Sequence, residues 1–273
     1  MATVMSVKGP IDADKMGITS IHEHIFLDLS RDAAGRDSML NDQELAYQEL
    51  VQYKQAGGTT IVDQTTGGLR GHDHDILPVT HALAVREMAE RTGINVILGA
   101  GWYRELYYPQ ELQRKKTDQI AEELVRDVEE GIEGTDVRAG VLGEIGAPFT
   151  WISPVEERVF RAVARAHKKT GVTVLTHAIN WPVGLDQLDI LTEEGVDPRR
   201  IVIGHCQSYP HHEYHAEIAR RGAFVAFDRM AIPNEYERGL LFRNIKQMVD
   251  AGLTDHIVFG QDVCRRSDYV AYG

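Results

Sequence analysis

The sequence predicts an α/β fold, a (β/α)8 TIM barrel, from three observations. Eight short aliphatic segments alternate with amphipathic segments of helical period. Several helical segments end in a glycine just before the next strand, which is the usual chemistry of a helix-to-strand loop. The length of 273 residues fits eight such units, because a barrel of this kind takes roughly 250 residues. We therefore expect a single domain over residues 1–273.

The expected strands are β-branched or aliphatic runs without strict alternation, a pattern typical of parallel strands buried on both faces. In chain order they are 17–26, 59–66, 95–102, 138–147, 172–178, 200–207, 223–230 and 256–263. An open doubly wound sheet is the alternative, and it needs a glycine-rich fingerprint after the first strand. The sequence at that point, IHEHIFLDLS, has no such fingerprint, so the barrel is favoured.

Two helical segments carry clear start and stop signals. Segment 41–57 begins with Asn and Asp and ends in Gly, and segment 153–171 has Ser153 as a candidate N-cap, Pro154 in its first turn and a terminal Gly. About seven helices separate the eight strands. The chain stops ten residues after the last strand without an eighth helix. We therefore expect a C-terminally truncated copy with an apolar seam exposed between the first and seventh helices, and the alternative is that a partner subunit covers this seam.

Composition and charge restrict the classes of function. The chain is 43% hydrophobic and 26% charged, an ordinary soluble composition, and its net charge of −12 argues against nucleic acid and membrane surfaces as partners. No apolar run approaches the roughly 20 residues of a membrane span, and no signal sequence begins the chain. The two cysteines suit a reducing compartment. We expect a cytoplasmic protein that acts on a small-molecule substrate.

Six side chains of metal-ligating type fall near the C-terminal ends of expected strands, where such a barrel builds its active site. They are His22, His24, Glu144, His177, His205 and Asp262. Because side chains alternate along a strand, the first two histidines point the same way. Imidazoles and carboxylates without a thiolate suit Zn²⁺ or a similar divalent ion, and six ligands exceed one tetrahedral site. Each residue alone could equally be a buried structural group, but their shared placement favours two metals.

The chain resembles the phosphotriesterase family of the amidohydrolase superfamily along its whole length. The matching motifs are HEH, GEIG, VLTHA, VIGHCQ, AFDR and FGQDVCRRSDYVAYG, on strands one, four, five, six, seven and eight. The resemblance implies that one metal is bound by His22, His24 and Asp262 and the other by His177 and His205. Family chains continue beyond the final YG with a glycine-rich turn and a helix.

The strand-four position distinguishes this chain within the family it resembles. Many members carry a carbamylated lysine there, whereas this chain has Glu144, as in the phosphotriesterase-homology subgroup. The resemblance implies that Glu144 bridges the two metals. The activity of the lysine-bearing phosphotriesterases and lactonases therefore does not transfer automatically, and we expect any organophosphate hydrolysis to be weak.

These ligands predict a metal-dependent hydrolase. Two metals roughly 3.5–4 Å apart can hold a bridging water and lower its pKa, and the resulting hydroxide attacks an ester, lactone or related carbonyl or phosphoryl centre. The resemblance assigns Asp262 as the proton shuttle, and the alternative is that it is only a ligand. The expected cofactors are two divalent ions, Zn²⁺ first, with Mn²⁺ or Co²⁺ as alternatives. An amidase for small N-acyl compounds and a metal-dependent binding protein without turnover stay open, and the chain is compatible with a homodimer.

Two further residues are candidates for contact with the substrate. Arg229 follows the seventh strand and can hold a carboxylate, phosphate or lactone oxygen, or form a salt bridge with Asp228 or a nearby acid. Tyr103 ends the third strand and resembles the aromatic residue that lines the pocket of related lactonases, or it packs at the barrel rim. Two histidine-rich segments, 71–75 and 209–215, are interpreted as polar loops rather than a third metal site.

Overall fold

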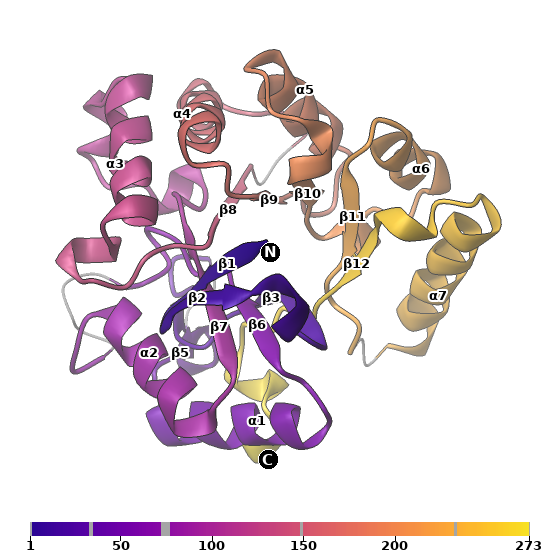
Figure 1. The fold of residues 1–273 in the computed structure, drawn as a ribbon. Helices are drawn as coiled ribbons and strands as arrows, with labels where there is room; N and C mark the ends of the chain where they lie inside the picture. The colour runs from indigo at the N-terminus through magenta and orange to yellow at the C-terminus, as the bar shows by residue number, and fades with distance from the viewer. Residues whose placement is uncertain (1, 33–34, 72–76, 148–149, 232–233, 273) are drawn as a thin grey trace.

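Eight parallel strands form one nearly closed barrel sheet, which confirms the predicted fold class (Figure 1). The computed structural model describes residues 2–32, 35–71, 77–147, 150–231 and 234–272. The strand order is β12-β11-β10-β9-β8-β7-β6-β3. The strands are β3 (Thr19–Glu23), β6 (Thr60–Asp63), β7 (Asn95–Ala100), β8 (Val141–Gly146), β9 (Val174–His177), β10 (Ile201–Ile203), β11 (Phe224–Phe227) and β12 (Ile257–Phe259). Each lies inside its expected range and is shorter, because the chain leaves the sheet where the polar loops begin.

A helix follows each of the first seven barrel strands, and these helices lie around the outside of the sheet (Figure 1). They are α1 (Gln43–Gln55), α2 (His81–Thr92), α3 (Thr117–Glu129), α4 (Pro154–Thr170), α5 (Gly184–Glu193), α6 (His212–Arg220) and α7 (Glu235–Asp250). The expected caps of α4 are present: Ser153 and Glu156 form a capping box, and Gly171 ends the helix at a φ of 74°.

A short antiparallel hairpin that the sequence analysis did not predict lies across one end of the barrel. It consists of β1 (Thr3–Ser6) and β2 (Gly9–Asp12), and the backbone N–H of Val7 donates to the carbonyl of Val96 in β7 at 2.8 Å. A Cβ atom on Gly140 would lie 2.2 Å from the carbonyl oxygen of Met5, so this close approach requires glycine. The hairpin covers the end opposite the strand C-termini. Two further short strands, β4 (Leu27–Asp28) and β5 (Met39–Leu40), pair on the loop after β3.

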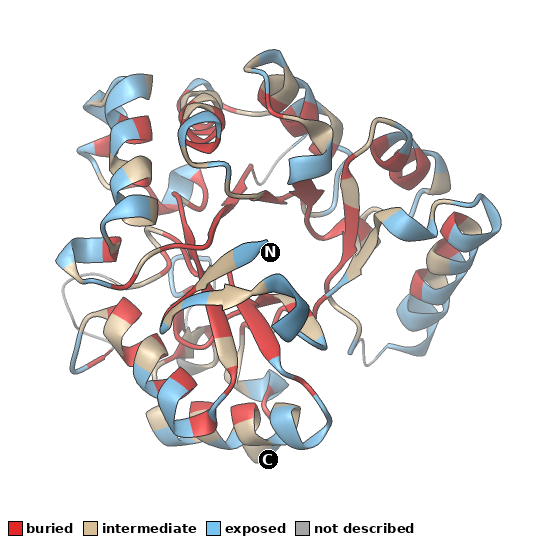
Figure 2. Cartoon of the chain, viewed as in Figure 1, coloured by how far each residue is buried: buried red, intermediate tan, exposed pale blue. Residues whose placement is uncertain are grey.

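The core lies between the sheet and its helices, with a smaller cluster inside the barrel. Figure 2 shows the strands as mostly buried and the outer sides of the helices as exposed. The cluster inside the barrel contains one aliphatic residue from each of six strands, namely Val62, Ile97, Val141, Leu175, Val202 and Ala226. Among the barrel strands, β12 is the least buried, and its Phe259 is 43% exposed.

The barrel has a seam where β3 and β12 meet. Within the described residues no ladder pairs these strands, and the backbone N–H of Asp262 donates to the carbonyl of His22 at 3.0 Å instead. Only short 3-10 turns follow β12 in the described chain, and the backbone N–H of Ala271 donates to Glu49 of α1 at 2.6 Å. An apolar groove of about 360 Å³ lies between α1 and this segment.

Two large apolar side chains of α7 are also exposed. On α7, Phe242 is 55% and Val249 is 48% exposed. The apolar seam between the first and seventh helices stays a prediction. No helix in the described ranges has the length and apolar character that a membrane crossing requires.

Candidate metal centre and active site

The structure brings the six predicted ligands together at the C-terminal ends of the strands, in two groups. In the first group, Nε2 of His22 lies 3.6 Å from Oε2 of Glu144 and 3.8 Å from Oδ1 of Asp262. Nε2 of His24 lies 3.6 Å from Oε1 of Glu144 and 3.4 Å from Oδ1 of Asp262. Tetrahedral ligands about 2.0–2.1 Å from an ion are about 3.4 Å apart, so these four side chains have the spacing of a divalent metal site.

The second group lies on the other side of Glu144. Its Oε2 atom lies 2.9 Å from Nδ1 of His177 and 3.4 Å from Nε2 of His205, and the two ring nitrogens are 2.8 Å apart. Glu144 therefore turns Oε1 toward His24 and Oε2 toward His177. A carboxylate in this position has the geometry of a ligand shared by two metals.

The burial of these groups also fits a bound cation. All six side chains belong to residues at most 7% exposed, and Nε2 of His22 has no hydrogen-bond partner among the described residues. An imidazole nitrogen left unpaired in the interior is costly, and a metal ion supplies the missing partner. Burial raises the pKa of the Glu144 carboxyl, but the neighbouring His177 and His22 outweigh this effect and hold that pKa well below its usual range. The donor set therefore fits divalent metal ions.

Two glycines allow Glu144 to reach this position. Gly143, with a φ of 138°, would place a Cβ atom 2.1 Å from the carbonyl oxygen of Leu175, and Gly146 would place one 2.6 Å from Cβ of His177. Both contacts are with β9, the neighbouring strand. Any side chain at either glycine would push β8 away from β9 at the point where Glu144 enters the site.

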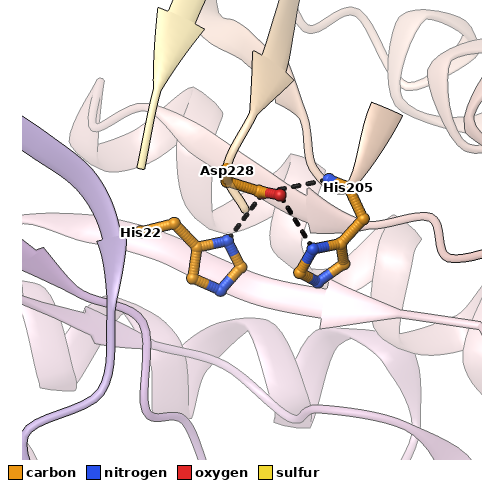
Figure 3. A group of neighbouring side chains, drawn as sticks. All are labelled: His22, His205 and Asp228. Atoms are coloured by element: carbon orange, nitrogen blue, oxygen red, sulfur yellow. Dashed lines mark hydrogen bonds and ion pairs between the residues drawn. The ribbon is translucent and has the colours of Figure 1, made fainter. Parts of the chain in front are cut away.

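Asp228, the residue after β11, orients one histidine from each group (Figure 3). Its carboxylate accepts hydrogen bonds of 2.9 Å from Nδ1 of His22 and from Nδ1 of His205, and another of 2.9 Å from the backbone N–H of His205. Because an ionised carboxylate only accepts, both rings carry their proton on Nδ1 and leave Nε2 free for a metal. Burial raises the pKa of Asp228, and the charges of His205 and His22 more than offset it, so that this pKa lies well below the usual value.

From the sequence, Asp228 is expected only as a salt-bridge partner of Arg229, and its contact with the two histidines was not predicted. Its position directly after a strand, at the same end of the barrel as the six ligands, was the available signal. In the structure Nε of Arg229 lies 3.8 Å from Oδ2 of Asp262. The side chain of Arg229 is 42% exposed at the mouth of the site.

A small pocket of about 130 Å³ opens over the two ligand groups. Its apolar wall contains Leu27, Leu29 and Leu69, and three arginines also line it, namely Arg104, Arg229 and Arg265. The predicted Tyr103 is part of this wall. Its ring packs edge-on against His177, and its hydroxyl lies 3.4 Å from Nε2 of that histidine.

Arg104 is held in place on the pocket wall. Its guanidinium forms an ion pair with Asp32 and stacks over the ring of Tyr103 at 4.6 Å. Arginine commonly stacks on aromatic rings in this way. The stacking and the ion pair fix both the cation and the aromatic ring beside the ligand cluster.

The histidine-rich segments contribute no ligands to this cluster in the part of the chain that the structure describes. Residues 72–76 of the first segment lie outside the described residues. In the second segment, His215 is buried and its Nε2 donates to the backbone carbonyl of Cys206 at 2.8 Å. This histidine therefore has a structural position in α6.

The barrel and the carboxylate-linked histidine cluster define the class of barrel hydrolases with a candidate metal centre. The chain belongs to the phosphotriesterase family, whose model matches residues 2–273. It is a hydrolase of that family, because relatives are named as hydrolases and similar solved structures include lactonases.

Several characterised proteins are similar to the chain over most of their length. The phosphotriesterase homology protein of Escherichia coli is 31% identical over 95% of this chain and 86% of its own. An aryldialkylphosphatase of Saccharolobus solfataricus is 33% identical over 96% and 82%. An N-acetyltaurine hydrolase of Danio rerio is 27% identical over 99% and 86%. A lactonase structure from Listeria monocytogenes superposes with a TM-score of 0.89 at 28% identity, covering 100% of this chain and 86% of that one.

Proposed function

We propose that the chain is a hydrolase with two divalent metal ions, which cleaves esters, lactones or related carbonyl or phosphoryl compounds. The observation that carries the proposal is the position of Glu144 between the two groups. Its Oε1 lies 3.6 Å from Nε2 of His24, and its Oε2 lies 2.9 Å from Nδ1 of His177 and 3.6 Å from Nε2 of His22. In this proposal Glu144 bridges the ions and five further side chains complete the two sites. One site is formed by His22, His24 and Asp262, and the other by His177 and His205.

Asp262 is the proton acceptor in the proposed reaction. When bound, two divalent ions lower the pKa of water and polarise the carbonyl or phosphoryl oxygen of a substrate. Oδ1 of Asp262 lies 3.4 Å from Nε2 of His24, whereas Oδ2 lies toward Arg229 and the pocket. One oxygen can therefore act as a ligand while the other accepts a proton and returns it to the leaving group.

The pocket favours a small substrate. Its volume of about 130 Å³ is below the roughly 300–1,000 Å³ of pockets that hold drug-sized ligands. The three leucines of the wall suit an apolar acyl chain or lactone ring. Tyr103 lies beside His177 and Arg229 lies beside Asp262, so both can contact a substrate held at the ligand cluster.

A second candidate function is the hydrolysis of small N-acyl compounds that carry an anionic group. Two observations favour it: relatives named N-acetyltaurine hydrolase match 99% of the chain, and three arginines line the pocket. Guanidinium groups bind carboxylates and related oxyanions through paired hydrogen bonds. The same attack on a carbonyl carbon cleaves an ester or an amide.

A panel assay on metal-loaded protein tests the proposal. The panel contains γ-lactones, aryl acetates, N-acyl amino acids, N-acetyltaurine and a phosphotriester, and the metal content per chain is measured on the same sample. We expect two ions per chain, turnover of at least one carbonyl substrate, loss of turnover on chelation and its recovery with Zn²⁺, Mn²⁺ or Co²⁺. Turnover that survives complete metal removal overturns the proposal, and metal binding without turnover of any substrate would identify a binding protein.

A further inference from the structure

Glu23 lies between the two candidate ligands of β3, His22 and His24, but its side chain points away from them. It is 7% exposed and lies at the seam between β3 and β12, on the side of the apolar groove. Glu23 has no role in the proposed reaction. A buried carboxylate is costly unless several donors bind it, so its partners indicate what it does.

The partners of Glu23 are the backbone amides on both sides of Asp262. Oε1 accepts from the backbone N–H of Gln261 at 3.0 Å and from the hydroxyl of Ser20 at 2.5 Å. Oε2 accepts from the backbone N–H of Val263 at 3.2 Å. The N–H of Asp262 itself donates to the carbonyl of His22 at 3.0 Å. Three consecutive amides of the loop after β12 are thus bound by two consecutive residues of β3.

This attachment replaces the ladder that β3 and β12 do not form in the described residues. It also holds a conformation that needs support, because Asp262 has a φ of 49°, which residues with a Cβ atom rarely adopt. Such backbone angles persist where the surroundings determine them, and they are common at functional sites. Removing the carboxylate leaves the amides of Gln261 and Val263, whose hydrogen bonds to Glu23 are partly buried, without these partners and frees the backbone on both sides of Asp262.

We propose that Glu23 is a positioning residue that holds the loop 261–263 so that the Asp262 carboxylate faces His24 and the pocket. The inference rests on the proposed function of Asp262 as ligand and proton acceptor. The middle residue of the His-Glu-His motif thereby acts on the opposite face of the strand from the two histidines. The side chain of Glu23 thus connects the first barrel strand, β3, to the loop after the last strand, β12, and supports the position of Asp262.

The variants Glu23→Gln and Glu23→Asp test this inference, with Glu156→Gln as the matched control. Glu156 is also a buried acid whose oxygens accept two backbone N–H bonds, from Ser153 and Glu105, and it does not line the pocket. With p-nitrophenyl acetate as the probe, we expect Glu23→Gln to lower kcat about 10–100-fold with KM changed less than 3-fold, the usual range for loss of an outer partner of a metal ligand. We expect Glu23→Asp to recover part of kcat and Glu156→Gln to keep it.

Two readouts separate positioning from a general loss of structure. In the background of Asp262→Asn, Glu23→Gln should cause no further loss of kcat, because residues that act through one another are not additive. The affinity for Zn²⁺ should fall in Glu23→Gln and remain unchanged in Glu156→Gln. Equal kcat and Zn²⁺ affinity in Glu23→Gln and wild type, or full additivity with Asp262→Asn, overturns the inference.

The same set distinguishes this inference from the proposed function. If Asp262→Asn keeps wild-type turnover, the proposed role of Asp262 fails regardless of Glu23. If Asp262→Asn loses turnover and Glu23→Gln does not, only the positioning role fails. If the Glu23 variants do not fold, hydrogen exchange of backbone amides in the wild-type protein tests the inference instead. We expect slow exchange at the amides of Gln261 and Val263, and exchange at the rate of an open loop contradicts the inference.

Discussion

The carboxylate of Asp228 accepts a hydrogen bond of 2.9 Å from Nδ1 of His22, although 206 residues separate the two in the chain. The same carboxylate binds the ring of His205, so one acid orients a ligand of each proposed metal (Figure 3). In the proposed centre, the two metal sites would therefore share an outer partner as well as Glu144. A change at Asp228 should affect both sites together.

We predict that Asp228→Asn weakens metal binding at both sites by about 10–100-fold while the protein stays folded. The amide can accept through only one atom, so at least one ring loses its partner. Competition with a chelator of known affinity measures the change, and Asp197→Asn, a change in an exposed acid paired with Arg199, is the control. Unchanged affinity at both sites would show that Asp228 does not orient the ligands.

We predict that Asp262→Asn lowers kcat about 10²–10⁴-fold, the range expected for loss of a general base, with a much smaller change in substrate affinity. Steady-state kinetics on the best substrate of the panel, at saturating metal, measures both constants. A variant with near-normal kcat would remove Asp262 from the proposed mechanism.

We predict that Arg229→Met raises KM for substrates with a carboxylate or sulfonate group and leaves KM for neutral lactones nearly unchanged. Arg229 lies at the mouth of the pocket with its side chain 42% exposed, so a charged substituent of the substrate can reach its guanidinium group. Parallel kinetics on a charged and a neutral substrate give the comparison. An equal effect on both classes would exclude charge recognition by Arg229.

We predict that His215 makes the protein less stable in acid. Burial lowers the pKa of His215 to about 4 from the ordinary 6.5, so the unfolded state binds one more proton between these values. The stability contributed by neutral His215 is present above about pH 6.5 and is lost as the pH falls toward 4. His215→Gln keeps the donor to Cys206 and removes the titration. Urea unfolding at several pH values should show a slope smaller than wild type by up to about 1.4 kcal/mol per pH unit, and identical slopes would refute the prediction.

The positions of the candidate ligands in the fold could be predicted from the sequence because residue type and strand end are both local properties. His177, for example, closes an aliphatic run, and Asp262 follows another. The function of Asp228 and the attachment made by Glu23 could not be predicted in this way. Both depend on which atoms meet across strands far apart in the chain, such as Glu23 and Val263. An acid after a strand is equally compatible with a surface salt bridge until the distances are known.

The strand ends were predicted too far into the loops for a related reason. His205 was assigned to a strand ending at residue 207, whereas β10 ends at Ile203 and His205 has a φ of 55°. The backbone turns there because the N–H of His205 donates to Asp228 rather than to a neighbouring strand. The apolar pattern of the sequence gives no information about this contact. A prediction from the sequence alone therefore places the end of the strand too far along the chain.

Metal stoichiometry in bicarbonate-free buffer tests the claim that Glu144 bridges two metals. A glutamate already carries its carboxylate, whereas a lysine ligand needs CO₂. Apo-protein reconstituted in CO₂-purged buffer should therefore bind two ions per chain, as it does with bicarbonate, and Glu144→Gln should lose at least one. A requirement for bicarbonate, or two ions retained by Glu144→Gln, would contradict the claim.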